Sequence, residues 1–235
     1  MRRAAGIFLA LFMILSVLGC GNNSGGIEKE TSPDDIFIEE FGEAINKRWT
    51  DQDKMDDTLS EEEYDKVGEN VWIAKSAKVF PSAYINGPAI IGKNAEVRHC
   101  AFIRGNAIVG EGAVVGNSTE LKNVILFNKV QVPHYNYVGD SVLGYKAHMG
   151  AGSITSNVKS DKTLTTVKTP EGAIETGLKK FGAILGDEVE VGCGSVLNPG
   201  TVIGRHTNIY PLSMVREFVP EDSIYKKRGE VVEKY

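Results

Sequence analysis

A short stretch near the middle of the chain concentrates side chains that can move a proton. Residues 131–140 read QVPHYNYVGD, and His134 is the best candidate for a general base among the four histidines. Imidazole groups titrate near neutral pH, which suits them to accept a proton from an amine or a hydroxyl. A single histidine in a loop is more often merely exposed, so this interpretation needs support from neighbouring residues.

Two basic residues give such support through their spacing. Arg104 and Lys122 are eighteen residues apart, which equals three of the six-residue units described below. We therefore expect the two side chains to lie one above the other on the same side of the molecule. There they would form a site for phosphate groups, although two solvated surface cations would show the same spacing.

A metal centre is the other chemistry that the histidines and cysteines could indicate. A zinc site built from His99, His134, His148 and His206 would need a close pair of histidines, which the sequence lacks. The three cysteines are distant from one another and form neither a CxxC motif nor a disulfide framework. We predict no metal in the site.

The elements that must position these side chains repeat every six residues. Large apolar residues recur at Ile73, Val79, Ile85, Ile91, Val97, Ile103, Val109, Val115, Leu121 and Phe127, and again at Leu185, Val191, Leu197, Ile203, Ile209 and Val215. Small residues, mostly alanine, stand two places before most of them. A period of six fits neither a helix nor a simple strand, and it indicates short strands joined by corners in a parallel β-solenoid. An ordinary antiparallel sheet is the alternative.

Two interruptions of this period are the expected positions of chemistry. The first is the stretch 131–140, and the second is residues 153–181, which are rich in Lys, Thr, Ser and Gly. Loops that project from a regular scaffold often carry binding groups. We therefore expect both interruptions to be loops, the first of them bearing His134.

Length and charge limit the possible functions. A chain of 235 residues with 42% hydrophobic residues can hold one solenoid domain with appendages. A net charge of −5 argues against a nucleic-acid-binding protein, which usually has a basic face.

The first 26 residues resemble the leader of a bacterial lipoprotein. Arg2 and Arg3 precede an apolar run over 4–18, and Cys20 follows Val-Leu-Gly. That order predicts lipidation of Cys20, anchoring to a membrane of the cell envelope, and a flexible Gly/Asn/Ser tether. A cytoplasmic protein with a buried N-terminal helix or a misassigned start is the alternative.

The next segment shows helical spacing. Apolar residues over 32–59 predict an amphipathic helix, and Ser60 followed by three glutamates predicts the N-cap of a second short helix. We expect residues 27–66 to cap the solenoid, residues 67–218 to form it and residues 219–235 to be a C-terminal tail.

Four motifs identify a known family. They are AFIRG (101–105), VGNSTELK (115–122), HYNYVGD (134–140) and GAGSITSN (150–157). In this order they resemble the acetyltransferase domain of the bifunctional N-acetylglucosamine-1-phosphate uridyltransferase/glucosamine-1-phosphate acetyltransferases. They are also similar to the C-terminal domain of archaeal sugar-1-phosphate nucleotidylyltransferases. The resemblance covers roughly residues 71–215, and it implies a left-handed β-helix of hexapeptide repeats, a homotrimer and active sites between subunits.

The resemblance also implies a role for individual residues. It makes His134 the catalytic base, Glu120 its support and Tyr137 a stabilising residue. It places Arg104 and Lys122 against the sugar phosphate or nucleotide. Asn157 would contact acetyl-CoA, the acyl donor.

Two positions depart from the family pattern. His148 stands where the family has an asparagine, so it would take the place of a substrate-binding residue. Cys193 stands at a small residue of the donor site. The Gly-rich nucleotide loop of the nucleotidyltransferase domain is not found in this sequence.

Two functions therefore stay open. The first is an acetyl-CoA-dependent N-acetyltransferase acting on an amino-sugar phosphate or sugar nucleotide, as in UDP-N-acetylglucosamine biosynthesis, without a nucleotidyltransferase domain. The second is a non-catalytic sugar-nucleotide-binding module or trimeric scaffold. The second is motivated by a conflict of compartment, because acetyl-CoA is cytosolic whereas a lipoprotein is exported.

Overall fold

The computed structural model describes residues 59–170, 172–227 and 230–233. The predicted leader with Cys20, the tether and residues 32–58 of the amphipathic helix predicted over 32–59 lie outside the described residues. Residues 1–60 and Glu61–Tyr235 are two separate units. The solenoid belongs to the second unit.

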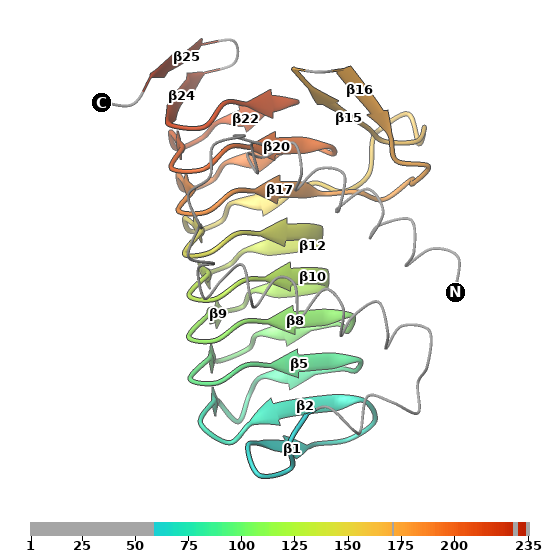
Figure 1. Ribbon diagram of the computed structural model, residues 1–235, viewed down its shortest axis with the longest axis vertical. Helices are drawn as coiled ribbons and strands as arrows, with labels where there is room; N and C mark the ends of the chain where they lie inside the picture. Colours follow the sequence, from blue (N-terminus) through green and yellow to red (C-terminus); the bar gives the residue numbers. More distant parts are fainter. Residues whose placement is uncertain (1–58, 171, 228–229, 234–235) are drawn as a thin grey trace, which may run out of the picture. The chain divides into compact units, whose positions relative to one another are not determined.

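Residues 71–227 form a parallel β-solenoid whose strands stack into three ladders (Figure 1). Coil follows coil at 16 to 18 residues, so that each strand pairs with the corresponding strand of the next coil. Only the coil that carries a long insertion departs from this spacing. The predicted fold class, a solenoid of hexapeptide repeats, is confirmed.

The first ladder, named the site ladder here, carries the candidate residues. Its strands are Tyr84–Ile85 (β4), Phe102–Ile103 (β7), the start of Glu120–Leu126 (β10), the start of Tyr137–Leu143 (β12), Ile154–Thr155 (β14), Val196–Leu197 (β19) and Met214–Val215 (β22).

The second ladder continues the same sheet around a corner. Its strands are Val71–Ala74 (β2), Ala89–Ile91 (β5), Ala107–Val109 (β8), the ends of β10 and β12, Ala183–Leu185 (β17), Thr201–Ile203 (β20) and Phe218–Val219 (β23).

The third ladder is a separate sheet. Its strands are Lys78–Val79 (β3), Glu96–Val97 (β6), Val114–Asn117 (β9), Gln131–His134 (β11), His148–Met149 (β13), Glu190–Val191 (β18), Asn208–Ile209 (β21) and Ser223–Lys227 (β24).

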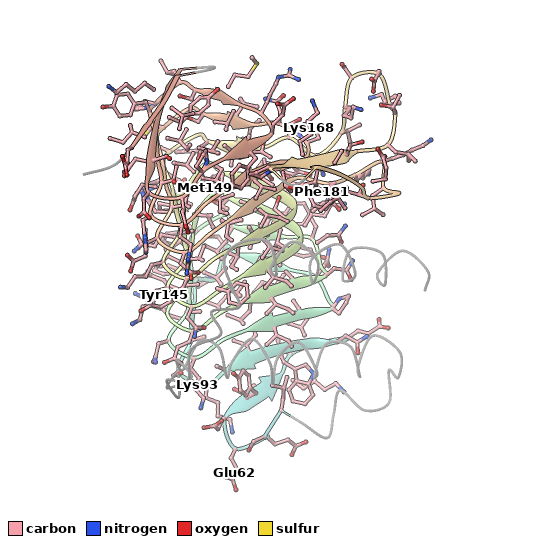
Figure 2. All side chains as sticks on the ribbon, turned by 45° about the horizontal axis from the view of Figure 1, so that its top comes forward. Glu62, Lys93, Tyr145, Met149, Lys168 and Phe181 are labelled. Atoms are coloured by element: carbon pink, nitrogen blue, oxygen red, sulfur yellow. The ribbon has the colours of Figure 1, made fainter. Side chains whose placement is uncertain are left out.

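One large apolar side chain per coil side fills the interior. Ile91, Val97, Ile103, Leu121, Leu185 and Leu197 are almost completely buried, and so are the small residues that precede them, such as Ala95, Ala101 and Ala113. Because no coil covers its own apolar stripe, the stability of each coil depends on its neighbours. Figure 2 shows side chains along the whole stack, with Lys93 and Tyr145 on one outer edge.

The phase of the repeat changes at two corners. Leu126, not the predicted Phe127, is the fully buried residue after Leu121, and Leu143 follows Val138 at the same interval of five. The shortened corners contain Asn123 and Asp140, both with a φ of 51°. Asparagine and aspartate tolerate this left-handed conformation better than most other residues, which explains how one residue is removed without breaking the coil.

The first predicted loop is part of the solenoid. Residues 131–140 form β11, a two-residue corner and the start of β12. The prediction of a projecting loop here was wrong because a five-residue side changes the period without ending the stack.

The second interruption does project. After β14 the chain forms a hairpin of Thr166–Thr169 (β15) and Gly172–Glu175 (β16), then returns through Phe181 into β17. Val167 and Phe181 are buried, whereas Lys168 of the hairpin forms an exposed ion pair with Glu217 at 2.6 Å. Lys168 and Phe181 are labelled in Figure 2.

Both ends of the described unit differ from the prediction. The Ser60–Glu63 segment begins no helix: it forms a turn that leads into Tyr64–Lys66 (β1), which pairs antiparallel with β2 and covers its open edge. Beyond residue 218 the solenoid continues into β24, and Glu230–Glu233 (β25) pairs antiparallel with it. Covering a free edge limits its pairing with other chains. None of the described residues belongs to a helix long and apolar enough to cross a membrane.

Candidate functional site

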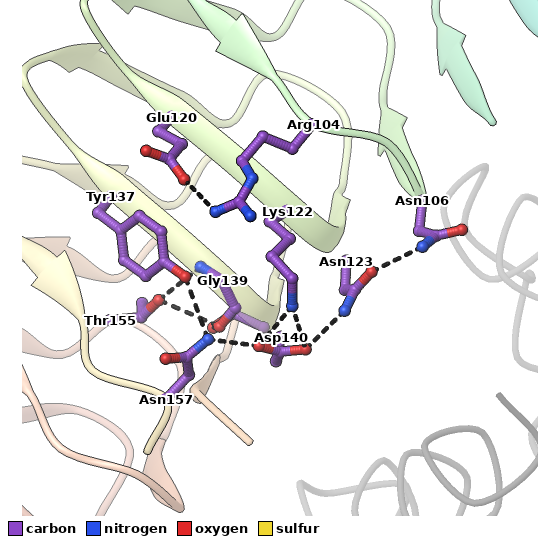
Figure 3. A network of polar contacts seen from close by, with 11 residues as sticks. Arg104, Asn106, Glu120, Lys122, Asn123, Tyr137, Gly139, Asp140, Thr155 and Asn157 are labelled. Atoms are coloured by element: carbon purple, nitrogen blue, oxygen red, sulfur yellow. Dashed lines mark hydrogen bonds and ion pairs between the residues drawn. The ribbon is translucent and has the colours of Figure 1, made fainter. Parts of the chain in front are cut away.

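Five of the predicted site residues lie together on the outer surface of the site ladder (Figure 3). Strands β7, β10 and β12 are neighbours, and their register pairs Phe102 with Glu120 and Glu120 with Tyr137. Alternation along a strand turns every second side chain outward. The sequence therefore places Arg104, Glu120, Lys122 and Tyr137 on the same surface, as the eighteen-residue spacing predicted for the two cations.

Each cation has a carboxylate partner. Arg104 donates from Nη1 to Glu120 Oε1 at 2.7 Å. Lys122 Nζ lies 3.3 Å from Asp140 Oδ1 and 3.4 Å from Oδ2. The hydrogen bond with Glu120 raises the pKa of Arg104 above its already high ordinary value. Each cation is thus paired with a carboxylate of a neighbouring coil.

Asp140 is the centre of the network, and sequence reasoning gave it no role. Its side chain is only 4% exposed. Besides Lys122, it accepts hydrogen bonds from Asn123 Nδ2 at 2.7 Å and from Asn157 Nδ2. Sequence reasoning missed it because Asn123 and Asp140 occupy the two corners where the period falls from six to five, and the large apolar Phe127 at the sixth place concealed the first of these changes.

Tyr137 is held by the same network. Its hydroxyl accepts a hydrogen bond from Asn157 Nδ2 at 3.1 Å. Burial raises the pKa of Tyr137, Asn157 opposes this, and the nearby charges of Asp140 and Glu120 add to the rise. The phenol therefore keeps its proton at neutral pH and can donate it in a hydrogen bond.

Gly139 leaves room for the Tyr137 ring. A Cβ atom built on Gly139 would lie 2.5 Å from the Tyr137 hydroxyl oxygen and 2.8 Å from Cζ. The φ of Gly139 is one that other residues adopt, so only this contact opposes a side chain. The absence of a Cβ thus lets the ring pack against its own strand.

We predict that Gly139→Ala will displace the Tyr137 ring toward solvent. Because burial is the main reason for the raised pKa of Tyr137, the displacement should lower that pKa toward its ordinary value. An NMR pH titration of ¹³C-labelled tyrosine measures this, with Tyr137→Phe identifying the resonance. A Tyr137 pKa unchanged by Gly139→Ala would show that the ring is not constrained by the glycine.

His134 lies around the corner from this network. It ends β11 of the third ladder, and its side chain is exposed. The buried side chain of Asn136 fixes the corner: its Oδ1 accepts from the His134 main-chain N–H at 3.1 Å, and its Nδ2 donates to Gly150 O at 2.9 Å. Among the described residues, no hydrogen bond joins the His134 imidazole to the network within one protomer.

The two departures from the family pattern also lie on the third ladder or at its edge. His148 of β13 pairs in register with Glu190, and its Nδ1 lies 2.7 Å from Glu190 Oε2. Cys193 follows β18 and is exposed. His134, Ala151 and Cys193 occupy equivalent positions in three successive coils. Cys193 therefore lies two coils from His134, about 10 Å away for strands spaced about 4.8 Å apart.

No group of histidine, cysteine and acidic side chains in the described part of the chain is arranged to hold a metal ion. Cys20 lies outside the described residues.

The chain matches known proteins over the same region. The model of the GMPPB C-terminal domain family matches residues 85–211. Over 118 residues the chain is 34% identical to the "Bifunctional protein GlmU" of Methanococcus aeolicus, covering 50% of this chain and 28% of that protein. It is 32% identical to a bifunctional sugar-1-phosphate nucleotidylyltransferase/acetyltransferase of Sulfurisphaera tokodaii, covering 48% and 28%. The match thus spans less than a third of these two relatives.

A further relative is similar over most of its length. The protein YaiX of Escherichia coli K12, named as an uncharacterised acetyltransferase, is 33% identical over 168 residues, which are 72% of this chain and 73% of YaiX. Among solved structures, a hexapeptide transferase family protein from Anaplasma phagocytophilum is 18% identical with a TM-score of 0.47, covering 70% of this chain and 80% of that one. By the match of its central region and its hexapeptide-repeat solenoid, the chain belongs to the GMPPB C-terminal domain family.

Proposed function

We propose that the chain is an acetyl-CoA-dependent N-acetyltransferase that acts on an amino-sugar phosphate or a sugar nucleotide, with glucosamine-1-phosphate as the model acceptor. The observation that carries this proposal is the polar network of the site ladder, with the exposed imidazole of His134 one corner away. The relatives named as acetyltransferases support the same reaction class.

In the proposed reaction, His134 accepts a proton from the acceptor amine as its nitrogen attacks the thioester carbonyl carbon. The C–N bond forms, the C–S bond breaks, and His134 returns the proton to the departing thiolate of CoA. Tyr137 donates its hydroxyl hydrogen to the oxyanion that develops on the carbonyl oxygen. The raised pKa of Tyr137 suits this role because the donor must be protonated.

Asn157 has one group left for the acyl donor. Both of its N–H groups are used, one on Tyr137 and one on Asp140. Its Oδ1 can therefore accept a hydrogen bond from an amide N–H of acetyl-CoA. In this proposal Cys193 lines the donor side, and His148, oriented by Glu190, faces the acceptor.

We further propose that the active site is completed between the subunits of a homotrimer. His134 stands at a corner of the coil, whereas the network lies on a flat ladder, so a corner of one subunit can meet the ladder of the next. The His134 imidazole of one subunit would then reach the network of the next subunit without any rearrangement of either solenoid.

A non-catalytic sugar-nucleotide-binding or scaffold module is the second candidate. The observation that favours it is the pairing of both cations with carboxylates inside the protein. A network of this kind can stabilise the fold without taking part in catalysis.

An assay of thiol release separates the two candidates. The full chain is incubated with acetyl-CoA and glucosamine-1-phosphate, galactosamine-1-phosphate or UDP-glucosamine, and calorimetry measures acetyl-CoA binding in parallel. We expect thiol release that requires the amine. If the chain neither binds acetyl-CoA nor turns over any amino sugar, the acetyltransferase is refuted and the non-catalytic binding or scaffold module is the function that remains.

A further inference from the structure

The insertion between β14 and β17 starts and ends at the site network. Asn157 lies just before the insertion leaves the solenoid, and where the chain returns, the Phe181 main-chain N–H donates to Asn157 O at 3.0 Å. The next residue, Gly182, donates its N–H to Asp140 O at 2.8 Å. Asn157 and Asp140 are also joined to each other through their side chains (Figure 3). Two consecutive residues of the returning chain therefore hold the main chains of both.

This junction of residues 157–158 with residues 180–183 is named the clasp. An antiparallel bridge between Val158 and Lys180 closes it on the side of the insertion. Phe181, within the clasp, is only 3% exposed, and burial of an aromatic ring of this size is strongly favourable. The clasp is therefore anchored in the core, whereas the hairpin beyond it projects.

Ser141 extends the clasp to the strand that carries Tyr137. The Ser141 hydroxyl oxygen accepts from the Ala183 main-chain N–H at 3.0 Å, and the hydroxyl donates to Gly139 O at 2.7 Å. Ser141 is buried, so leaving either of these groups without its partner is costly. Gly139 is the residue against which the Tyr137 ring packs. The returning chain thus also holds the support of that ring.

The clasp has no room for a side chain at Gly182. A Cβ atom built there would overlap the Ser141 hydroxyl oxygen and the Gly139 carbonyl oxygen, and it would lie 3.2 Å from Asp140 O. The φ of Gly182 lies outside the left-handed region, so this contact alone opposes a side chain. Because two of the three atoms belong to the main chain, an alanine here must move the returning chain away from residues 139–141.

We infer that the clasp positions Asn157 for the acyl donor, with Gly182 and Ser141 as positioning residues. This inference rests on the proposed function, in which Asn157 Oδ1 accepts a hydrogen bond from acetyl-CoA. The Asn157 amide keeps a fixed orientation only while its Nδ2 group bonds Asp140 and Tyr137. The clasp sets the separation of the main chains on which these two bonds depend. Because a binding group must be held within about 0.5 Å of its productive position, loosening the clasp should weaken donor binding.

Three alanine variants separate positioning from loss of stability. Gly182→Ala opens the clasp by adding a Cβ atom, and Ser141→Ala removes a hydrogen-bonded bridge without adding bulk. Gly204→Ala is the matched control. A Cβ atom at Gly204, just after β20, would likewise overlap main-chain atoms, those of Glu221, and its φ also lies outside the left-handed region. Glu221 belongs to neither the clasp nor the network.

Calorimetry with acetyl-CoA measures the effect on the donor. We expect Gly182→Ala to raise the Kd for acetyl-CoA about 3- to 10-fold, the range for loss of one hydrogen bond, and Ser141→Ala to raise it as well. Gly204→Ala should change this Kd less than about twofold, even where its Tm falls as far as that of Gly182→Ala. Equal changes of Kd in the two glycine variants would overturn the inference.

Solvent exchange of the Asn157 side-chain amide is a readout independent of activity. In protein labelled with ¹⁵N-asparagine, the Asn157 amide protons are identified by their absence from Asn157→Ser. We expect their exchange to be at least about tenfold faster in Gly182→Ala than in the unsubstituted chain, because the opened clasp frees them from Tyr137 and Asp140. Gly204→Ala should leave this exchange unchanged. Unchanged exchange in Gly182→Ala would also overturn the inference.

Ser141→Ala gives the same two tests if Gly182→Ala does not fold. The outcomes also separate this inference from the proposed function. A chain that binds no acetyl-CoA refutes the acetyltransferase, and faster exchange in the clasp variants then still supports the positioning of Asn157. Faster exchange with an unchanged Kd for acetyl-CoA would refute the role of the clasp in donor binding, even in an active enzyme.

Discussion

Replacing His134 by alanine is expected to lower kcat for acetyl transfer by about 10²- to 10⁴-fold, the usual contribution of a general base. The fold should be unaffected, because Asn136 fixes this corner through the main-chain N–H of residue 134 and not through its side chain. The measurement is steady-state thiol release with glucosamine-1-phosphate, together with rescue by added imidazole.

His99→Ala provides the control for this variant. His99 occupies the same corner two coils below His134, where its imidazole packs against Phe80 with ring centroids 4.4 Å apart. We expect less than a threefold change in kcat. Full activity of His134→Ala would remove this residue as the base and would direct attention to His148, whose partner Glu190 already orients it.

Replacing Leu126 by alanine is expected to lower the free energy of unfolding by about 2–5 kcal/mol, the range for loss of a fully buried leucine. Leu126 is 0% exposed and stacks between Val109 and Leu143 in the second ladder. Phe127→Ala, at the adjacent and only partly buried position, should cost about 1–2 kcal/mol, because part of its ring is already exposed to water and its loss leaves no closed cavity. Urea unfolding of both variants measures the difference. A larger loss for Phe127→Ala would contradict the five-residue corner at Asn123.

The hexapeptide pattern predicted the solenoid because the contacts that produce it recur at a constant separation along the chain. Each inward residue from Ile73 to Leu121 meets its equivalent one coil away, so the period in the sequence is the period in space. The same reasoning failed at Phe127, where the pattern still showed a large apolar residue at the sixth place. Only the left-handed backbone at Asn123 reveals that the inward position had moved to Leu126.

The candidate site was predicted in part. The spacing of Arg104 and Lys122 placed both cations on one surface, since one whole coil separates them. It could not show that a buried carboxylate, Asp140, already neutralises Lys122, because side-chain burial at a corner depends on the stack above and below. The position of His134 on another ladder was likewise hidden while residues 131–140 were interpreted as a loop.

The predicted helix at Ser60 shows how a free edge can override a local signal. A serine followed by three glutamates favours a helix N-terminus in isolation. The segment lies instead beside the unpaired edge of β2, where Tyr64–Lys66 gains main-chain hydrogen bonds as β1. Pairing that edge satisfies groups that a helix would leave unpaired.

The insertion between β14 and β17 leaves the three ladders continuous, but it gives one plane between neighbouring coils a longer chain connection than the other planes have. Residues that pair across this plane, such as Val142 and Ile184, are 42 residues apart in the chain. Residues that pair across the other planes between coils are 16 to 18 residues apart. Loop-closure entropy rises by only about 0.6 kcal/mol for each doubling of length, so the longer connection is tolerated. Under tension along the solenoid axis, we expect the coils on either side of this plane to separate farther than other neighbouring coils before the chain is taut, once the β15–β16 hairpin has come away from the solenoid.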